Sequence, residues 1–92
     1  MDDLELIQKL WSENKVRWTN HCLMRMRQRH ITREEVTECI NTGSIIRKYP
    51  EDSPCISCLI SSEVCNKILH VVVGYDSVTV HVVTTYRPEG RD

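Results

Sequence analysis

The chain has 92 residues, enough for one small domain and too few for two separate hydrophobic cores. Hydrophobic residues make up 40% of it and charged residues 27%, a balance typical of folded globular proteins that excludes a disordered tail, a collagen-like repeat and a membrane protein. Lysine and arginine number 12 against 13 acidic residues, so the formal net charge of −1 gives no overall basic excess. We therefore expect residues 1–92 to form a single domain.

The N-terminal segment MDDLELIQKLW is acidic and then amphipathic, whereas a secretory signal begins with basic residues before an apolar stretch. The chain also has no apolar run approaching the roughly 18–20 residues that cross a bilayer. We expect a cytoplasmic protein with no membrane partner. Its five cysteines are then expected to be reduced and mostly buried thiols.

The first two predicted helices flank a short extended piece. Apolar residues at helical spacing predict the first helix over residues 3–13. Residues 16–18 follow as the extended piece. Thr19 and Asn20 favour a helix N-cap and predict a second helix that runs to about residue 29.

The third predicted helix is delimited at both ends. Thr32 and Glu35 form a Thr-x-x-Glu capping box that starts it. Gly43 stands where a C-cap glycine is expected after a helix that ends at about residue 42. The helical part of the chain is therefore predicted to cover residues 1–43.

After residue 43 the sequence changes to short β-rich runs separated by turn residues. Four strands are predicted, near residues 45–49, 55–61, 68–73 and 78–85. Helices followed by consecutive strands predict an α+β fold, with the N-terminal helices on one face of an antiparallel sheet of about four strands. The sheet part is expected to cover residues 44–86, and residues 87–92 form a tail.

Positive charge is concentrated in the second predicted helix and its flanks, because residues 14–33 contain no acidic side chain. The basic residues and histidines of this stretch are Lys15, Arg17, Arg25, Arg27, Arg29, Arg33, His21 and His30. Four polar side chains share one arc of the helix, namely His21, Arg25, Gln28 and Arg29. The adjoining arc is apolar and is expected to face the sheet through Cys22, Leu23 and Met26.

Arg25 and Arg29 stand four residues apart on the predicted helix, so their charges repel each other. A glutamate at this spacing would instead gain about 0.2–0.5 kcal/mol. The uncompensated pair indicates an anion site, because guanidinium groups bind phosphate oxygens in a bidentate manner. The alternative is a basic patch that acids of the third helix neutralise, such as Glu34, Glu35 and Glu38.

Two histidines, His70 and His81, lie on the last two predicted strands. A connecting loop of two or four residues would place them opposite each other, either as an acid–base pair or as a structural polar pair. A three-residue loop would instead put His70 on the face of Thr84 and Tyr86. The sequence is compatible with both registers.

Cys55 and Cys58 form a Cys-x-x-Cys pair, a spacing found in zinc and redox sites. Three positions apart on a strand, however, their side chains point to opposite faces. No second Cys-x-x-Cys and no His-x-x-x-His completes a tetrahedral zinc set, and a thioredoxin-type motif would cap a helix after a strand. We expect no metal and no cofactor.

Several short motifs follow one another along the chain, in the order Thr19-Asn20-His21, Arg25-Met26-x-x-Arg29, Ile31-Thr32-x-x-x-Val36 before Gly43, Ile46-x-x-Tyr49-Pro50, Leu69-His70-Val71-Val72 and Thr84-x-Tyr86. Over residues 16–86, their order and spacing resemble a family of small prokaryotic proteins described as a domain of unknown function, the DUF4258 type. That family is similar to the RelE/barnase-like ribonuclease toxins, which are often encoded beside a small zinc-finger antitoxin.

The resemblance implies a RelE/barnase-like fold and a metal-independent endoribonuclease, similar to an mRNA interferase. The implied partners are RNA, free or on the ribosome, and a cognate antitoxin protein. The expected catalytic residues are His21, His70, Thr84 and Tyr86, and the expected phosphate- or RNA-binding residues are Arg17, Arg25, Gln28 and Arg29. The chain departs from the family pattern at Ser61-Ser62, where a glycine is expected, and at Cys55, Cys58 and His81, which are not part of it.

The expected reaction is in-line attack of a ribose 2′-hydroxyl on its own phosphate. It requires a base, an acid for the 5′ leaving oxygen and cations for the developing charge. His21 or His70 can fill either proton role at neutral pH, and Arg25 and Arg29 can hold the scissile phosphate. The last motif supplies a tyrosine that stacks on a base or donates a proton, and a threonine that orients a neighbour. Two alternatives use the same basic helix without cleavage: a nucleic-acid-binding module and a protein-interaction module.

Overall fold

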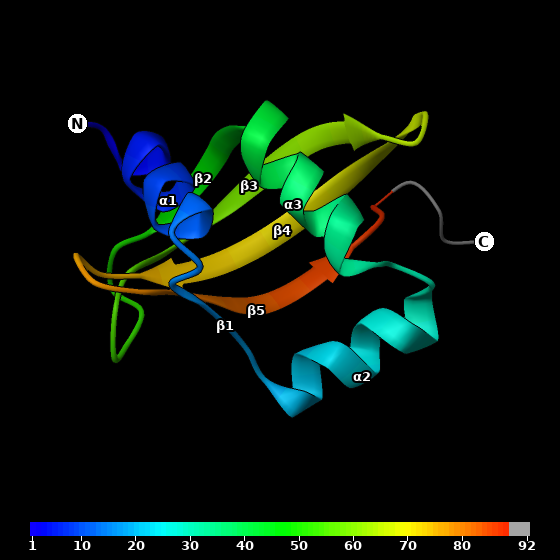
Figure 1. Cartoon of the computed structure of the whole chain (residues 1–92), viewed down its shortest axis with the longest axis horizontal. Helices are drawn as coiled ribbons and strands as arrows, with labels where there is room; N and C mark the ends of the chain where they lie inside the picture. Colours follow the sequence, from blue (N-terminus) through cyan, green and yellow to red (C-terminus); the bar gives the residue numbers. More distant parts are fainter. Residues whose placement is uncertain (89–92) are drawn as a thin grey trace.

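The computed structural model describes residues 1–88. In this part of the chain the helices come before the strands, except for one short strand between the first and second helices. The elements are α1 Asp3–Ser12, β1 Val16–Trp18, α2 Asn20–Arg29, α3 Arg33–Thr42, β2 Ser44–Tyr49, β3 Ser57–Val64, β4 Lys67–Tyr75 and β5 Val80–Tyr86 (Figure 1). The predicted α+β class is confirmed. Residues 89–92 of the predicted tail lie outside the described residues.

The strands form one five-stranded sheet in the order β1-β5-β4-β3-β2, so the prediction of about four antiparallel strands is wrong at one edge. The additional strand is β1, which runs parallel to β5 with Val16 opposite Val80 and Trp18 opposite Val82. A three-residue strand shows too little alternation to be separated from a loop by sequence, and its partner lies more than sixty residues away.

The helices occupy two places around the sheet. α1 and α3 cover one face, which we call the inner face, as predicted, whereas α2 lies beside β5 at the edge of the sheet (Figure 1). β1 pairs with β5 only as far as Val82, and α2 continues along the remaining edge. There the Arg29 Nη1 donates a 3.0 Å hydrogen bond to the carbonyl oxygen of Thr85. No helix of residues 1–88 lies over the opposite, outer face (Figure 1).

Side-chain caps fix where each helix begins. Asp2, Thr19 and Thr32 accept hydrogen bonds from the N–H of the third residue of α1, α2 and α3, at 2.8, 3.0 and 3.1 Å respectively. α2 ends at His30, whose φ of 59° is left-handed. Gly43 is the C-cap of α3 as predicted, but its backbone is extended, with φ −92° and ψ −175°.

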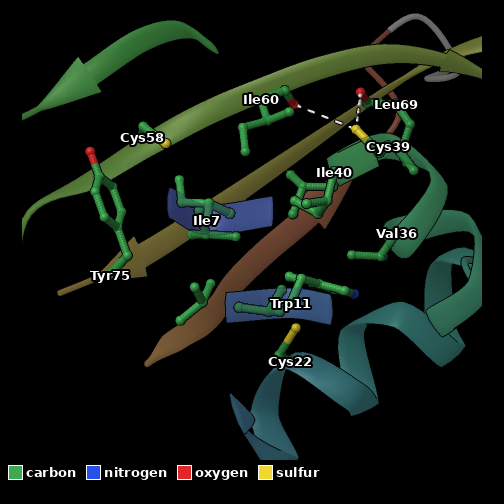
Figure 2. Packing of buried hydrophobic residues seen from close by; sticks show 14 of the residues in the cluster. Ile7, Trp11, Cys22, Val36, Cys39, Ile40, Cys58, Ile60, Leu69 and Tyr75 are labelled. Atoms are coloured by element: carbon green, nitrogen blue, oxygen red, sulfur yellow. Dashed lines mark hydrogen bonds between the residues drawn. The ribbon is translucent and has the colours of Figure 1, made fainter. Parts of the chain in front are cut away.

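Aliphatic side chains fill the core between the inner face and the helices (Figure 2). Its fully buried members include Ile7, Val36, Ile40, Ile60, Leu69, Val71, Val73, Val80 and Val82. The apolar arc of α2 reaches the same core through Cys22 and Met26, which are 1% and 3% exposed, while Leu23 is half-buried, so the predicted inward arc is confirmed. The thiol of Cys39 contacts the carbonyl oxygens of Ile60 and Leu69 at 3.8 and 3.5 Å.

The hairpin between β4 and β5 pairs in neither of the two predicted registers, but it places His70 on the face of Thr84 and Tyr86, as the second of them predicts. β4 continues through Gly74 and Tyr75, and the turn is closed by Asp76, whose Oδ1 accepts hydrogen bonds from the N–H groups two and three residues later. As a result His70 lies opposite Tyr86, and His81 lies opposite Gly74. Both histidines point to the outer face, but they do not face each other.

Candidate functional site

The outer face carries the polar residues of β4 and β5, because side chains alternate along each strand. On β4, His70 and Val72 alternate with the buried Leu69 and Val71. On β5, Thr84 and Tyr86 are opposite Val72 and His70, and all of these outer side chains are half-buried. The sequence motifs Leu69-His70-Val71-Val72 and Thr84-x-Tyr86 therefore meet on one surface.

His70 and Tyr86 form a close pair on this surface, at one end of the pairing between β4 and β5. The imidazole Nδ1 of His70 is 3.4 Å from the Tyr86 hydroxyl oxygen. The two rings pack edge to face, with centroids 5.3 Å apart and planes at 75°. A general acid or base and a hydroxyl donor are thus held together by two neighbouring strands.

Arg29 brings a permanent positive charge to the same surface from the last turn of α2. Its Nη1 donates to Thr84 Oγ1 at 3.3 Å and to the Thr85 carbonyl oxygen at 3.0 Å. Those two bonds hold one side of the guanidinium against β5. We call Arg29, His70, Thr84 and Tyr86 the His70 cluster.

Arg25 and His21 continue the arc of Arg29 along α2, one and two helical turns respectively towards its N-terminus. Both side chains are exposed. Gln28 is exposed on the same helix, and none of these three side chains bonds to another side chain in residues 1–88. The structure therefore joins Arg29 directly to the strand residues and places the other three predicted residues of α2 next to them on the helix surface.

Acidic residues of α3 do not neutralise the arginines of α2 within residues 1–88. In that part of the chain, the ion pairs involve Lys9, Lys15, Lys48 and Arg87. Glu35, one of the acids considered from sequence, instead lies 3.2 Å from Arg87. The basic arc is thus exposed and unpaired in the described residues.

Arg17 lies at the other end of the outer face. It is exposed on β1 and is paired in register with His81, which lies opposite Gly74. Gly74 is four residues along β4 from His70, a distance of about 13 Å. The structure therefore does not bring Arg17 into the His70 cluster.

Sequence reasoning missed one contact on this face. Cys55 lies in the connection between β2 and β3, and its Sγ is 4.0 Å from the Nδ1 of His81 on β5. These residues are 26 positions apart and no local pattern joins them. Within residues 1–88, no three histidine, cysteine or acidic side chains converge as a metal site would require. None of the helices there has the length and apolarity needed to cross a membrane.

Fold and site together define a small α+β domain in which a basic helix flanks the strand that carries a His–Tyr pair. Residues 18–87 match the family described as a domain of unknown function (DUF4258), and the chain belongs to that family. The matched segment contains all the predicted site residues except Arg17. No curated protein and no solved structure matches the chain. The similarity to RelE/barnase-like toxins stays a prediction.

Proposed function

We propose that this protein is a metal-independent RNA endonuclease of the toxin type, which cleaves by attack of a ribose 2′-hydroxyl on the adjacent phosphate. The observation that carries the proposal is the His70 cluster, where a guanidinium anchored to β5 lies beside a His–Tyr pair on an uncovered sheet face. The resemblance of the motifs to RelE/barnase-like ribonucleases supports the same chemistry. The nucleophile belongs to the substrate.

Arg29 is suited to bind the scissile phosphate because part of its guanidinium is still available. The side chain has five N–H donors, and within residues 1–88 only those on Nη1 are used, for Thr84 and Thr85. The Nε and Nη2 donors can therefore form the bidentate contact that phosphate oxygens prefer. Arg25, one turn away, adds a second cation for the charge that develops during the attack.

His70 is assigned the proton transfer, since imidazole gives and takes protons near neutral pH. Tyr86 positions the ring of His70 and offers an aromatic face on which an unpaired base can stack. Thr84 holds Arg29. His21, two turns of α2 before Arg29, is assigned the second proton role.

The test is cleavage of a labelled RNA in EDTA by the wild-type protein and by Arg29→Ala and His70→Ala. Removing the phosphate contact is expected to lower the cleavage rate about 10²–10³-fold, and removing the proton transfer about 10²–10⁴-fold. Arg27→Ala is the matched control, because it removes the same charge from the same helix on a different face. Its cleavage rate is expected to stay within about twofold of wild type.

Three results would overturn the proposal in different ways. Equal cleavage by all variants would remove the His70 cluster from the reaction. Salt-sensitive RNA binding by wild type without any product would indicate a non-catalytic nucleic-acid-binding module. No affinity for RNA, together with salt-sensitive capture of an acidic protein, would indicate a protein-interaction module.

The cognate antitoxin that the proposal includes should relieve the growth arrest caused by the wild-type protein and bind it in a pull-down.

A further inference from the structure

A cavity of about 360 Å³ opens on the outer face, at the end of the sheet away from the His70 cluster. It lies between β5 and the connection from β2 to β3, the green loop beside the ends of β4 and β5 in Figure 1. Its polar lining comes from Thr19, Asp52 and Ser57, and its thiol and imidazole come from Cys55 and His81. This site is separate from the proposed nuclease.

A thiol and an imidazole meet inside this cavity. The 4.0 Å between Cys55 Sγ and His81 Nδ1 is within the range of a hydrogen bond to sulfur. The ring of His81 lies directly against the backbone of Gly74, where a Cβ would come 2.4 Å from Cε1 and 2.5 Å from Nε2. Because glycine stands there, the ring can lie flat on β4 and present Nδ1 to the thiol.

Positive charge from two elements lies near Cys55 and can attract an anionic reactant. Thr19 is the N-cap of α2, so the positive end of that helix reaches the cavity. Arg17 is the register neighbour of His81 on β1. Two carboxylates are also near: Asp52 lines the cavity and accepts a hydrogen bond from the Ser57 hydroxyl, and Asp76 accepts two from the backbone of its own turn.

The other four thiols are held in the unreactive protonated form. Burial raises the pKa of Cys39 to about 11 and of Cys58 to about 12, and it also raises the pKa of Cys22. Cys65 is exposed, but a hydrogen bond with Glu35 raises its pKa. A thiol reacts as its thiolate, so these four are disfavoured as nucleophiles at neutral pH.

We propose that Cys55 is the reactive thiol of this protein, with His81 as its base, and that it exchanges with small anionic disulfides entering the cavity. His81 takes the proton of the Cys55 thiol, and the thiolate attacks one sulfur of the disulfide. A new S–S bond forms at Cys55 as the S–S bond of the reactant breaks. The departing thiolate takes the proton back from His81, which leaves a mixed disulfide on the protein and one released thiol.

Glutathione disulfide is the probe, and the readout is the intact mass of the whole protein followed by peptide mapping. Wild type at pH 7 is expected to gain one glutathione, on Cys55. Cys55→Ser should abolish the gain. Cys65→Ser, which removes the other accessible thiol, should leave the rate unchanged.

The role of His81 is tested separately from the presence of the thiol. His81→Asn and Gly74→Ala, which displaces the ring, should each slow the modification about tenfold or more at pH 7. The difference in rate from wild type should narrow as the pH is raised, because hydroxide can then replace His81 as the base. Circular dichroism checks that each variant is folded. If Gly74→Ala does not fold, His81→Asn alone tests the role of His81. Modification spread equally over Cys55 and Cys65, or an unchanged rate in His81→Asn, would overturn the proposal.

Discussion

Arg25 and Arg29 lower the stability of α2 by repelling each other, but the same two charges are suited to bind an anion. Arg25 and Arg29 stand one turn apart, and no carboxylate of residues 1–88 pairs with either. Like charges at this spacing destabilise a helix by about as much as an opposite pair stabilises it, 0.2–0.5 kcal/mol. A single acidic substitution should therefore stabilise the protein and remove its proposed activity together.

Arg25→Glu is expected to raise the free energy of unfolding by roughly 0.5 kcal/mol, because it replaces a repulsive pair by an attractive one. RNA binding at low salt should fall at least tenfold. Urea denaturation and filter binding measure the two effects. Arg27→Glu is the control, since it makes the same charge change without a basic residue four positions away; equal RNA binding by the two variants would exclude Arg25 from the site.

A second residue-scale contact ties the start of α1 to the end of β4. The hydroxyl of Tyr75, a residue only 3% exposed, donates a 2.7 Å hydrogen bond to Asp3 Oδ2, and Lys48 Nζ lies 3.0 Å from the same oxygen. The bond from Tyr75 and then the contact with Lys48 lower the pKa of Asp3. A carboxyl whose pKa is lowered by folding stabilises the fold above its ordinary value of 3.8.

Tyr75→Phe is expected to lower the free energy of unfolding by about 1 kcal/mol at neutral pH, because it removes this bond. The loss should shrink as the pH falls through the lowered pKa of Asp3, since the protonated carboxyl gains little from the bond. Urea denaturation at pH 7 and at pH 3 measures the difference. Tyr49→Phe is the control, because the Tyr49 hydroxyl has no hydrogen bond within residues 1–88; an equal loss in both variants would contradict the assignment.

At the scale of the elements, Gly43 and Gly74 both lie at close contacts. The neighbours of Gly43 include backbone atoms, whereas the nearest neighbours of Gly74 belong to a side chain that can move. A Cβ on Gly43 would lie 2.6 Å from the carbonyl oxygens of Cys39 and Ser61, which belong to the backbones of α3 and β3. The three atoms nearest to a Cβ on Gly74 would all belong to the ring of His81. Neither glycine has a positive φ, so close approach is what each position requires.

Gly43→Ala is therefore expected to lower the free energy of unfolding by about 2–3 kcal/mol, because α3 has to move away from β3. Gly74→Ala should cost less than about 1 kcal/mol, since a side chain can turn aside. Thermal and urea unfolding of both variants test the order. If Gly74→Ala were the more damaging of the two, the packing of α3 on β3 would not be as tight as described.

Element boundaries were predictable where a side chain sets them. Thr19 and Thr32 start α2 and α3 as their cap preferences indicate, and Gly43 follows α3. The turn between β4 and β5 was placed two residues too early, because Gly74 reads as a turn residue although the carboxylate of Asp76 closes the turn. The sequence predicts an extended piece over residues 16–18 but not its place in the sheet, because only its distant partner β5 makes it a strand.

For the whole molecule, Arg87 fastens the end of the sheet to the helical layer. Its Nη1 donates to the carbonyl oxygens of Val64 and Lys67, at 3.0 and 3.3 Å, and its Nη2 lies 3.2 Å from Glu35 at the start of α3. Burial opposes the ionisation of Glu35, but hydrogen bonds from the Thr32 backbone N–H and the Cys65 thiol, and then the charge of Arg87, outweigh it. The pKa of Glu35 is lowered as a result.

Arg87→Ala is expected to lower the free energy of unfolding by about 2 kcal/mol, because two carbonyls and a half-buried carboxylate lose their donor. Glu35 stabilises the fold above its ordinary pKa of 4.5, and this contribution is lost as the pH falls through the lowered pKa. The difference between wild type and variant should therefore decrease in acid. Lys67→Ala, an exposed cation on the same hairpin, is the control in urea denaturation at pH 7 and pH 3; a loss equal to that of Arg87→Ala would contradict this role.

The composition of the His70 cluster came from the order of the motifs, whereas its geometry required the fold. Nothing local to Arg29 indicates that its guanidinium meets Thr84, 55 positions later. Nor does a strand pattern reveal the bulge that shifts the pairing between Val72 and Val73 and so aligns His70 with Tyr86. Charge clustering and motif spacing can name such residues, but contacts across the sheet decide which of them meet.

Both β1 and α2 pack against β5, which is the last strand to be synthesised. The His70 cluster can therefore form only after β5 has been made. These early segments leave the ribosome long before Val80–Tyr86 has been translated. Until that last strand emerges, α2 has no edge to rest on, and Arg29 is held by nothing that fixes its direction. A chain that stops before residue 80 lacks β5, and with it Thr84 and Tyr86, so it lacks the His70 cluster on which the proposed cleavage depends.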